Sequence, residues 1–280
     1  MKGKVYLVGA GPGDPELLTV KALRILRAAD VVFHDELVAS GILNLVPPTV
    51  LVRNVGKRCG RKAISQDEIN SLMVASAIAG MTVVRLKGGD PLIFGRAGEE
   101  IEALLAAGVD FEIVPGVTAA LGAAASAQIP LTHRRFASAL VLLTGHRSAE
   151  TLQTNWRAIV SAGATLVLYM PGDDYPGSAN KLRTAGLSGQ TPCVIVSCAT
   201  TPQEEIYLTN LEKLPDAPRL AAPALLVVGE VARLANLSEK GEGRLQCLFP
   251  SLSSETLGGR RRNHAVSAHD SSCGKLQNSM

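Results

Sequence analysis

The amino-acid sequence predicts an α/β fold, and three observations lead to it. Short apolar segments alternate with segments of helical periodicity along most of the 280 residues. Apolar residues make up 46% of the chain but aromatic residues only 4%. The core must therefore consist mainly of Val, Leu, Ile and Ala, as in buried parallel strands. Several apolar segments also end in glycine-rich turns, where open α/β sheets bind their ligands.

The first half of the chain contains four predicted strands. A strand at 4–8 ends in a glycine turn, and Asp14, followed by a proline, predicts the start of a helix. Ser65 and Glu68 predict a capping box at the start of the next helix, which Gly80 closes. The other predicted elements are strands at 31–33, 82–86 and 111–114 and helices at 99–107 and 117–127.

The second half contains five more predicted strands, with two helices between them. The strands lie at 140–144, 165–170, 194–197, 206–209 and 225–228, and the helices at 152–162 and 178–185. We therefore expect an N-terminal α/β domain at 1–115 and a C-terminal α/β domain at 116–240. In residues 241–280 the periodicity disappears and Ser, Gly, Arg and Asn dominate, which is typical of a disordered tail.

Composition and charge argue against several classes of protein. A net charge of only +3 does not favour a general nucleic-acid surface. The five cysteines form no C-x-x-C pair and no His cluster has zinc spacing, so we expect reduced thiols, no bound metal and a cytoplasmic location. The N-terminus lacks the apolar run of a signal peptide. No stretch of about twenty uncharged apolar residues predicts a membrane span.

The first glycine turn, at 9–14, only partly matches the dinucleotide-binding motif. That motif, G-x-G-x-x-G, requires glycine at its sixth position, where this chain has Asp14. The Asp14 carboxylate would lie where a pyrophosphate contacts the positive end of a helix. Asp35, just past the second strand, could imitate the ribose-binding acid of such folds. The glycine spacing nevertheless disfavours NAD.

Two further turns follow strands and carry small residues. Gly88 and Gly89 lack side chains, so a ligand can approach their backbone closely. Asp90 can accept hydrogen bonds from a ribose or an amine. A third turn, at 115–119, supplies more small groups. Three strand-ending turns of this kind predict a single cradle for one ligand.

Four segments of the chain resemble the tetrapyrrole methylases. They are residues 9–19, residues 29–35, residues 85–95 with the following Glu99 and Glu100, and residues 115–119. Residues 55–58 (VGKR) and 130–134 (PLTHR) resemble one branch of that family, which methylates uroporphyrinogen III. The resemblance covers about residues 3–236 and leaves the tail without a counterpart.

This resemblance implies two α/β domains with the active site in the cleft between them, and a homodimer. It implies methylation of two ring carbons of uroporphyrinogen III to give precorrin-2, for sirohaem or cobalamin. It also implies S-adenosylmethionine as the methyl donor and S-adenosylhomocysteine as its product. By the family pattern, the donor site consists of Pro12, Gly88, Gly89, Asp90, Ile93, Thr118, Ala119, Met170 and Ala199.

The family pattern also implies roles for charged residues. Asp35 would be the general base and Lys57 the proton donor, because a methylated pyrrole ring must lose a proton. The tetrapyrrole carries several carboxylates, which arginine side chains bind well. The arginines expected to bind them are Arg58, Arg85, Arg96 and Arg134. This chain departs from the pattern at Ala199, where relatives often have glycine, and at His34, where they often have tyrosine.

Two alternatives remain open. The chain could methylate a later corrin precursor, or it could be a non-catalytic module that binds S-adenosylmethionine. Residues 55–58 and Asp35 favour the earlier substrate. Intact Asp35 and Lys57 argue against a non-catalytic module. Relatives that act on diphthine or ribosomal RNA share the glycine turns, but the small net charge argues against RNA.

Overall fold

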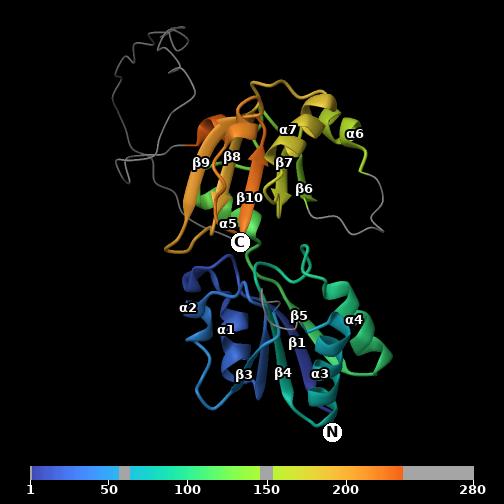
Figure 1. Ribbon diagram of the computed structural model, residues 1–280. Coiled ribbons are helices and arrows are strands. Elements are labelled where there is room, and N and C mark those ends of the chain that lie inside the picture. The colour runs from blue at the N-terminus through green and yellow to red at the C-terminus, as the bar shows by residue number, and fades with distance from the viewer. Residues whose placement is uncertain (1, 57–63, 146–153, 236–280) are drawn as a thin grey trace, which may run out of the picture. The chain divides into compact units, whose positions relative to one another are not determined.

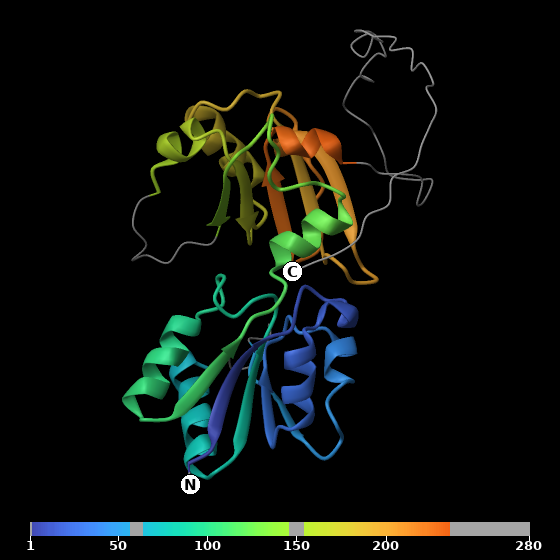
Figure 2. The same ribbon diagram turned by 180° about the vertical axis from the view of Figure 1, so that it is seen from behind.

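The computed structural model describes residues 2–56, 64–145 and 154–235. These residues form two five-stranded sheets, one in each half of the chain. Figures 1 and 2 show helices on both faces of each sheet. The predicted α/β class is confirmed by this arrangement. The predicted tail at 241–280 lies outside the described residues.

All strand pairs of the first sheet are parallel, as the apolar composition predicted. The strand order is β3-β2-β4-β1-β5. The strands are β1 (Lys4–Gly9), β2 (Val31–His34), β3 (Leu51–Asn54), β4 (Thr82–Lys87) and β5 (Asp110–Val114).

Helices cover both faces of this first sheet. Neighbouring residues of β1 point to opposite faces of the sheet. Val8 packs in the core under α1 (Val20–Arg27) and α2 (Ser40–Leu43). Leu7 packs in the core under α3 (Gln66–Ile78) and α4 (Ala97–Ala106). A parallel sheet covered on both faces leaves only its edges and its strand ends to solvent.

The second sheet is mixed, which the composition did not predict. Its order is β6-β7-β10-β8-β9, and only the β6/β7 pair is parallel. The turn between β8 and β9 is too short for the crossover that a parallel pair needs, so these strands form an antiparallel hairpin. The strands are β6 (Leu140–Thr144), β7 (Thr165–Tyr169), β8 (Pro192–Ser197), β9 (Glu205–Asn210) and β10 (Ala224–Val228).

Separate cores lie on the two faces of the second sheet. Helix α5 (Ala119–Ser126) contributes alanines to one core, against alternate residues of β7, β8 and β10. Helices α6 (Trp156–Ser161) and α7 (Tyr175–Thr184) contribute to the other. Two 3-10 helices, Leu214–Asp216 and Glu230–Leu234, complete this half. Among the described residues, we find no helix with the length and hydrophobicity needed to cross a bilayer.

The local signals for helix starts were right in one case and incomplete in another. Ser65 Oγ accepts a hydrogen bond from the Glu68 backbone N–H at 3.1 Å, and the Glu68 carboxylate accepts one from the Ser65 N–H at 2.7 Å. The predicted capping box is thus confirmed. Asp14 caps only the 3-10 helix Pro15–Leu17, and the α-helix starts anew with Thr19 as its cap. Neither α2 nor the edge strand β3 was predicted, because each has only four residues, too few to show a periodic apolar pattern.

An ion-paired carboxylate on the edge strand β5 gives the first prediction. Glu112 accepts a hydrogen bond from Lys4 Nζ at 2.8 Å and pairs with Lys21. The hydrogen bond from Lys21 has the largest effect and that from Lys4 the next largest. Together they lower the pKa of Glu112 from 4.5 to about 2. Because the folded-state pKa lies below the unfolded one, the stabilisation is present above pH 4.5 and is lost as the pH falls towards 2.

We therefore expect Glu112→Gln to lower the melting temperature slightly at pH 7, since exposed ion pairs contribute little. The difference from the unmodified protein should shrink as the pH falls from about 4.5 towards 2, because both proteins then lack the negative charge. Thermal unfolding followed by circular dichroism over this pH range measures it. A difference that stays constant across the range would contradict the assignment.

Candidate active site

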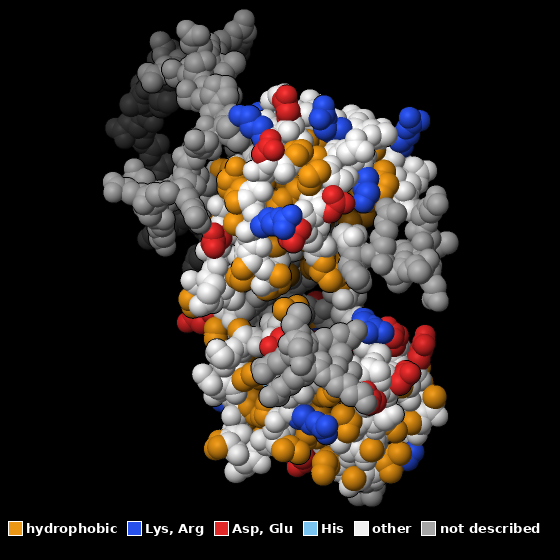
Figure 3. All heavy atoms as spheres, viewed as in Figure 1, with side chains coloured by type: hydrophobic (Ala, Val, Ile, Leu, Met, Phe, Trp, Pro, Cys, Tyr) orange, Lys and Arg blue, Asp and Glu red, His pale blue; other side chains and the backbone are white. Residues whose placement is uncertain are grey.

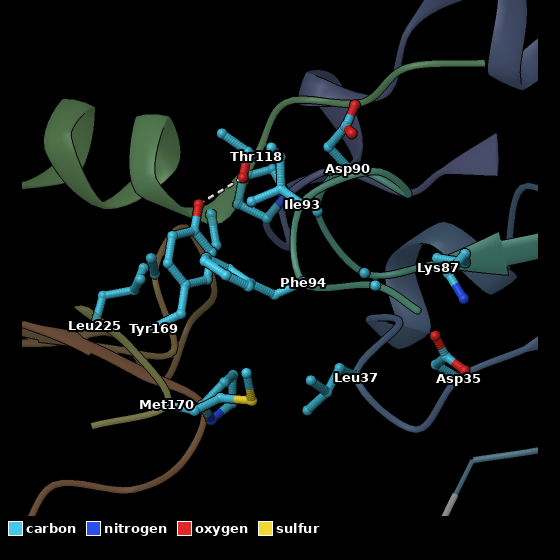
Figure 4. A pocket seen from close by; sticks show the side chains of 18 of the residues that line it. Asp35, Leu37, Lys87, Asp90, Ile93, Phe94, Thr118, Tyr169, Met170 and Leu225 are labelled. Carbon is cyan, nitrogen blue, oxygen red and sulfur yellow. Dashed lines mark hydrogen bonds between the residues drawn. The ribbon is translucent and has the colours of Figure 1, made fainter. Parts of the chain in front are cut away.

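A pocket lies where the strand ends of the first sheet meet residues of the second sheet. Its volume is about 930 Å³, including space open to solvent. Figure 4 shows Asp35 and Lys87 at one end of this pocket and Tyr169 and Met170 at the other. Asp35 and all nine residues expected to bind the donor line this one pocket: Pro12, Gly88, Gly89, Asp90, Ile93, Thr118, Ala119, Met170 and Ala199.

The three glycine turns meet through bare backbone. A Cβ atom on Gly9 would lie 2.6 Å from Gly116 Cα and 2.7 Å from the Gly89 carbonyl oxygen. Real Cβ atoms do not approach this closely, so side chains at these positions would force the turns apart. Gly11 and Gly89 also exchange two backbone hydrogen bonds, at 2.8 and 3.1 Å. The turns after β1, β4 and β5 therefore form one continuous wall.

Asp90 ties two of these turns together. One of its carboxylate oxygens accepts a hydrogen bond from the Leu92 N–H at 2.8 Å, and the other accepts one from the Gly116 N–H at 3.0 Å. The first bond closes the turn after β4, and the second links that turn to the one after β5. Asp90 therefore shapes the wall in addition to lining the pocket.

The opposite wall is anchored by Tyr169, at the end of β7. Its hydroxyl hydrogen-bonds with Thr118 Oγ1 at 2.6 Å and accepts a bond from the Ala120 N–H at 3.0 Å, so it binds the start of α5 (Figure 4). The ring of Phe94 packs against the Tyr169 ring, with 5.0 Å between centroids. Tyr169 was not predicted as a pocket residue, since its only signal in the sequence was its position at a strand end.

Strained backbone is concentrated around this pocket. Among the described residues, six other than glycine have a left-handed φ, and Phe94 (51°) and Met170 (50°) line the pocket. Two more, Cys198 (47°) and Thr200 (64°), flank Ala199. A left-handed backbone is unfavourable for L-residues by about 1–2 kcal/mol each. Such residues cluster at ligand sites, where the surrounding structure holds them in place.

A buried group of charges borders the Asp35 end of the pocket. Arg85 and Glu100 are 2% and 0% exposed, and Arg85 Nε donates to Glu100 at 2.9 Å. The same guanidinium pairs through Nη2 with Asp35, whose side chain is 30% exposed. Lys87, which lines the pocket, donates to both Glu100 oxygens at 2.8 and 3.0 Å. Burial, and then the neighbouring Arg85, lower the pKa of Lys87.

Not every residue expected to bind substrate or move protons lies at the pocket. Lys57 and Arg58 fall outside the described residues. Arg85 does not line the pocket, and its buried guanidinium is occupied by Glu100 and Asp35, so its assignment as a binder of substrate carboxylates needs correction. Arg96 and Arg134 are exposed and lie outside the lining, and Arg96 pairs with Glu99 at 2.6 Å.

The turn after β1 also differs from a dinucleotide-binding turn. It leads into the three-residue 3-10 helix instead of directly into an α-helix, so it lacks the helix dipole that binds a pyrophosphate. The Asp14 carboxylate accepts the Glu16 N–H at 2.8 Å, and its own N–H donates to Thr200 Oγ1 at 3.1 Å. This geometry supports the argument against NAD.

Comparison with known proteins agrees with the site. The family described as tetrapyrrole (corrin/porphyrin) methylases matches residues 4–215. The uroporphyrinogen-III C-methyltransferase of Paracoccus denitrificans (strain Pd 1222) is 46% identical over 237 residues, which are 83% of this chain and 83% of that protein. The siroheme synthase of Pseudomonas aeruginosa (strain UCBPP-PA14) is 48% identical over 235 residues, 83% of this chain. Those residues make up only 50% of the synthase, so this chain spans about half its length.

The same relationship holds in three dimensions. A crystal structure of uroporphyrin III C-methyltransferase from Thermus thermophilus, complexed with S-adenosylhomocysteine, superposes with a TM-score of 0.72 at 39% identity. The match covers 83% of this chain and 94% of that one. The family match extends over residues 4–215, and the Paracoccus enzyme is 46% identical over 83% of each chain. This chain therefore belongs to the tetrapyrrole methylases.

Proposed function

We propose that this chain transfers methyl groups from S-adenosylmethionine to two ring carbons of uroporphyrinogen III, giving precorrin-2 for sirohaem or cobalamin. The observation that carries the proposal is that one pocket gathers Asp35 and every residue expected at the donor site. The relatives named for this reaction or for sirohaem synthesis support it. We propose only the methylation, because the chain spans about half the length of the siroheme synthase that it matches.

The residues of the pocket fit such a donor. Gly88 and Gly89 bare the backbone, so a bulky ligand can lie against the chain itself. The side chains of Ile93 and Met170 offer apolar contact, and Asp90 is a carboxylate on the same wall. When bound, S-adenosylmethionine supplies an activated methyl group on a cationic sulfur. The pocket's contribution is to hold the reacting groups in place, which lowers the barrier substantially.

Asp35 is the proposed general base. Its carboxylate lies on the pocket wall and is partly exposed, so it can accept the proton that a methylated ring carbon loses. When that C–H bond breaks, its electron pair returns to the ring and the proton goes to the carboxylate. Lys57 as proton donor, and Arg58, Arg96 and Arg134 as ligands of substrate carboxylates, remain part of the proposal.

Three further features belong to the same proposal. Two domains, 1–115 and 116–240, accord with the two sheets, each of which has its own helices and cores. The active homodimer follows from the family resemblance, and the cytoplasmic location from the unpaired cysteines of the sequence. On the described part of the face in Figure 3, the Lys and Arg side chains are scattered among acidic and neutral ones, so this part offers no continuous basic patch for RNA.

An assay with purified protein, S-adenosylmethionine and uroporphyrinogen III tests the reaction. Mass spectrometry should detect the addition of two methyl groups. We expect Asp35→Asn to lower kcat by about 100-fold, the lower range of a general base, while calorimetry finds S-adenosylhomocysteine binding unchanged. Donor binding without transfer to any tetrapyrrole would instead support the non-catalytic module. Transfer only to a later corrin precursor would support the other alternative.

A matched pair of glycine variants tests the donor site. A Cβ on Gly88 would lie 3.4 Å from Leu37 Cβ, an ordinary contact, so Gly88→Ala should fold normally but narrow the pocket. We expect S-adenosylhomocysteine to bind about tenfold more weakly, as a mild steric overlap would cause. Gly116→Ala would place its Cβ 2.9 Å from Gly9 Cα and should lower the melting temperature. Unchanged binding by Gly88→Ala, measured by calorimetry, would argue against donor binding here.

A further inference from the structure

We propose that Arg85, Glu100 and Lys87 form a charge network that positions the Asp35 carboxylate for proton transfer. This inference rests on the proposed function, in which Asp35 is the base. The charge network, defined as these three residues, borders the pocket through Lys87, pairs with Asp35 through Arg85, and joins α4 to the ends of β2 and β4. Arg85, Glu100 and Lys87 are positioning residues, since they act on the reaction through Asp35.

The strand geometry brings these residues together. Arg85 and Lys87 are two residues apart on β4, so their side chains leave the sheet on the same face. Glu100 reaches that face from α4 and accepts hydrogen bonds from both. Asp35 directly follows β2, which is the neighbour of β4 and pairs His34 with Leu86. Arg85 therefore bridges Glu100 on α4 and Asp35 at the end of β2.

The Arg85 guanidinium fixes Asp35 because two nitrogen atoms of its planar group bind two different carboxylates. Nε donates to the buried Glu100, and Nη2 pairs with Asp35 Oδ1. Nη1 adds contacts at 3.4 Å to the carbonyl oxygens of Phe33 and Leu86. A guanidinium held at so many points cannot rotate, so the position of Asp35 Oδ1 is set. Within the described residues no hydrogen bond to Asp35 Oδ2 is found, so in this proposal Oδ2 is the oxygen that accepts the proton.

The burial of the network argues that it serves more than stability. Arg85, Glu100 and Lys87 are at most 2% exposed, and removing charges from water is costly even when they are paired. Apolar residues of similar volume would often stabilise a fold as well or better. Glu100 compensates both buried cations, since Lys87 binds its two oxygens and Arg85 one of them. The arrangement is therefore explained better by orientation of Asp35 than by a gain in folding free energy.

A double-mutant cycle between Arg85→Lys and Asp35→Asn tests the proposal. Lysine keeps the positive charge but lacks the planar fork, so charge alone should not rescue orientation. We expect Arg85→Lys to lower kcat for uroporphyrinogen III by about 100-fold, the cost of a small misplacement at a reacting group. In the Asp35→Asn background the same change should alter kcat by no more than about twofold, since its target is gone.

Two readouts and one control exclude a general structural effect. The KM for S-adenosylmethionine and the calorimetric affinity for S-adenosylhomocysteine should change little in Arg85→Lys, because the Arg85 side chain does not line the pocket. Glu112→Gln removes an ion-paired carboxylate from the same sheet, away from the pocket, and should keep the kcat of the unmodified protein. If Arg85→Lys does not fold, Glu100→Gln takes its place in the cycle with the same expectation, because it keeps the shape of the side chain.

The outcomes separate the two proposals. If the unmodified protein adds no methyl group to uroporphyrinogen III, the proposed function fails and the positioning role fails with it. If methylation occurs but Arg85→Lys keeps full kcat, only the network proposal is overturned. The same holds if the substitution lowers kcat equally with and without Asp35, because a purely structural defect acts on both backgrounds alike.

Discussion

The contact between the backbones of Gly9, Gly89 and Gly116 is the constraint on which the pocket depends. Three parallel strands end at one edge of the first sheet, and their turns can touch only because no side chain separates them. The backbone bonds between Gly11 and Gly89 and the Asp90 carboxylate then hold the turns in register. A wall built in this way presents peptide groups to a ligand, with the neighbouring side chains at its margins.

The second sheet completes the pocket by a different principle. Its strands are mostly antiparallel, and its contribution comes from Tyr169, which holds the start of α5, and from the left-handed backbone at Met170. Strain of that kind persists only where packing determines the conformation. At the other end, the pairing of Arg85 with Glu100 and Asp35 makes a rigid corner of charges. One end of the pocket thus contains left-handed backbone, and the other end contains buried ion pairs.

Local signals in the sequence predicted most of the first half correctly. The capping box at Ser65 and the glycine turns were found because caps and turns depend on a few adjacent residues. The edge strand β3 was missed, since its four residues (LVRN) are too few and do not alternate between apolar and polar side chains. The start of α1 at Thr19 was missed because Asp14 and its proline give an equally good signal five residues earlier.

The amino-acid order alone was enough to predict the α/β class, the three turns and, through family resemblance, the residues expected around the donor. These features depend on short motifs, in which a glycine or a capping side chain determines the conformation of the residues next to it. The three-dimensional fold was needed to find that Arg85 is buried against Asp35 and Glu100 and that Lys87 and Tyr169 line the pocket. It also decided the mixed order of the second sheet. Burial and pairing depend on which distant segments the fold brings into contact. The sequence around an arginine or a tyrosine therefore does not show which residues it will contact.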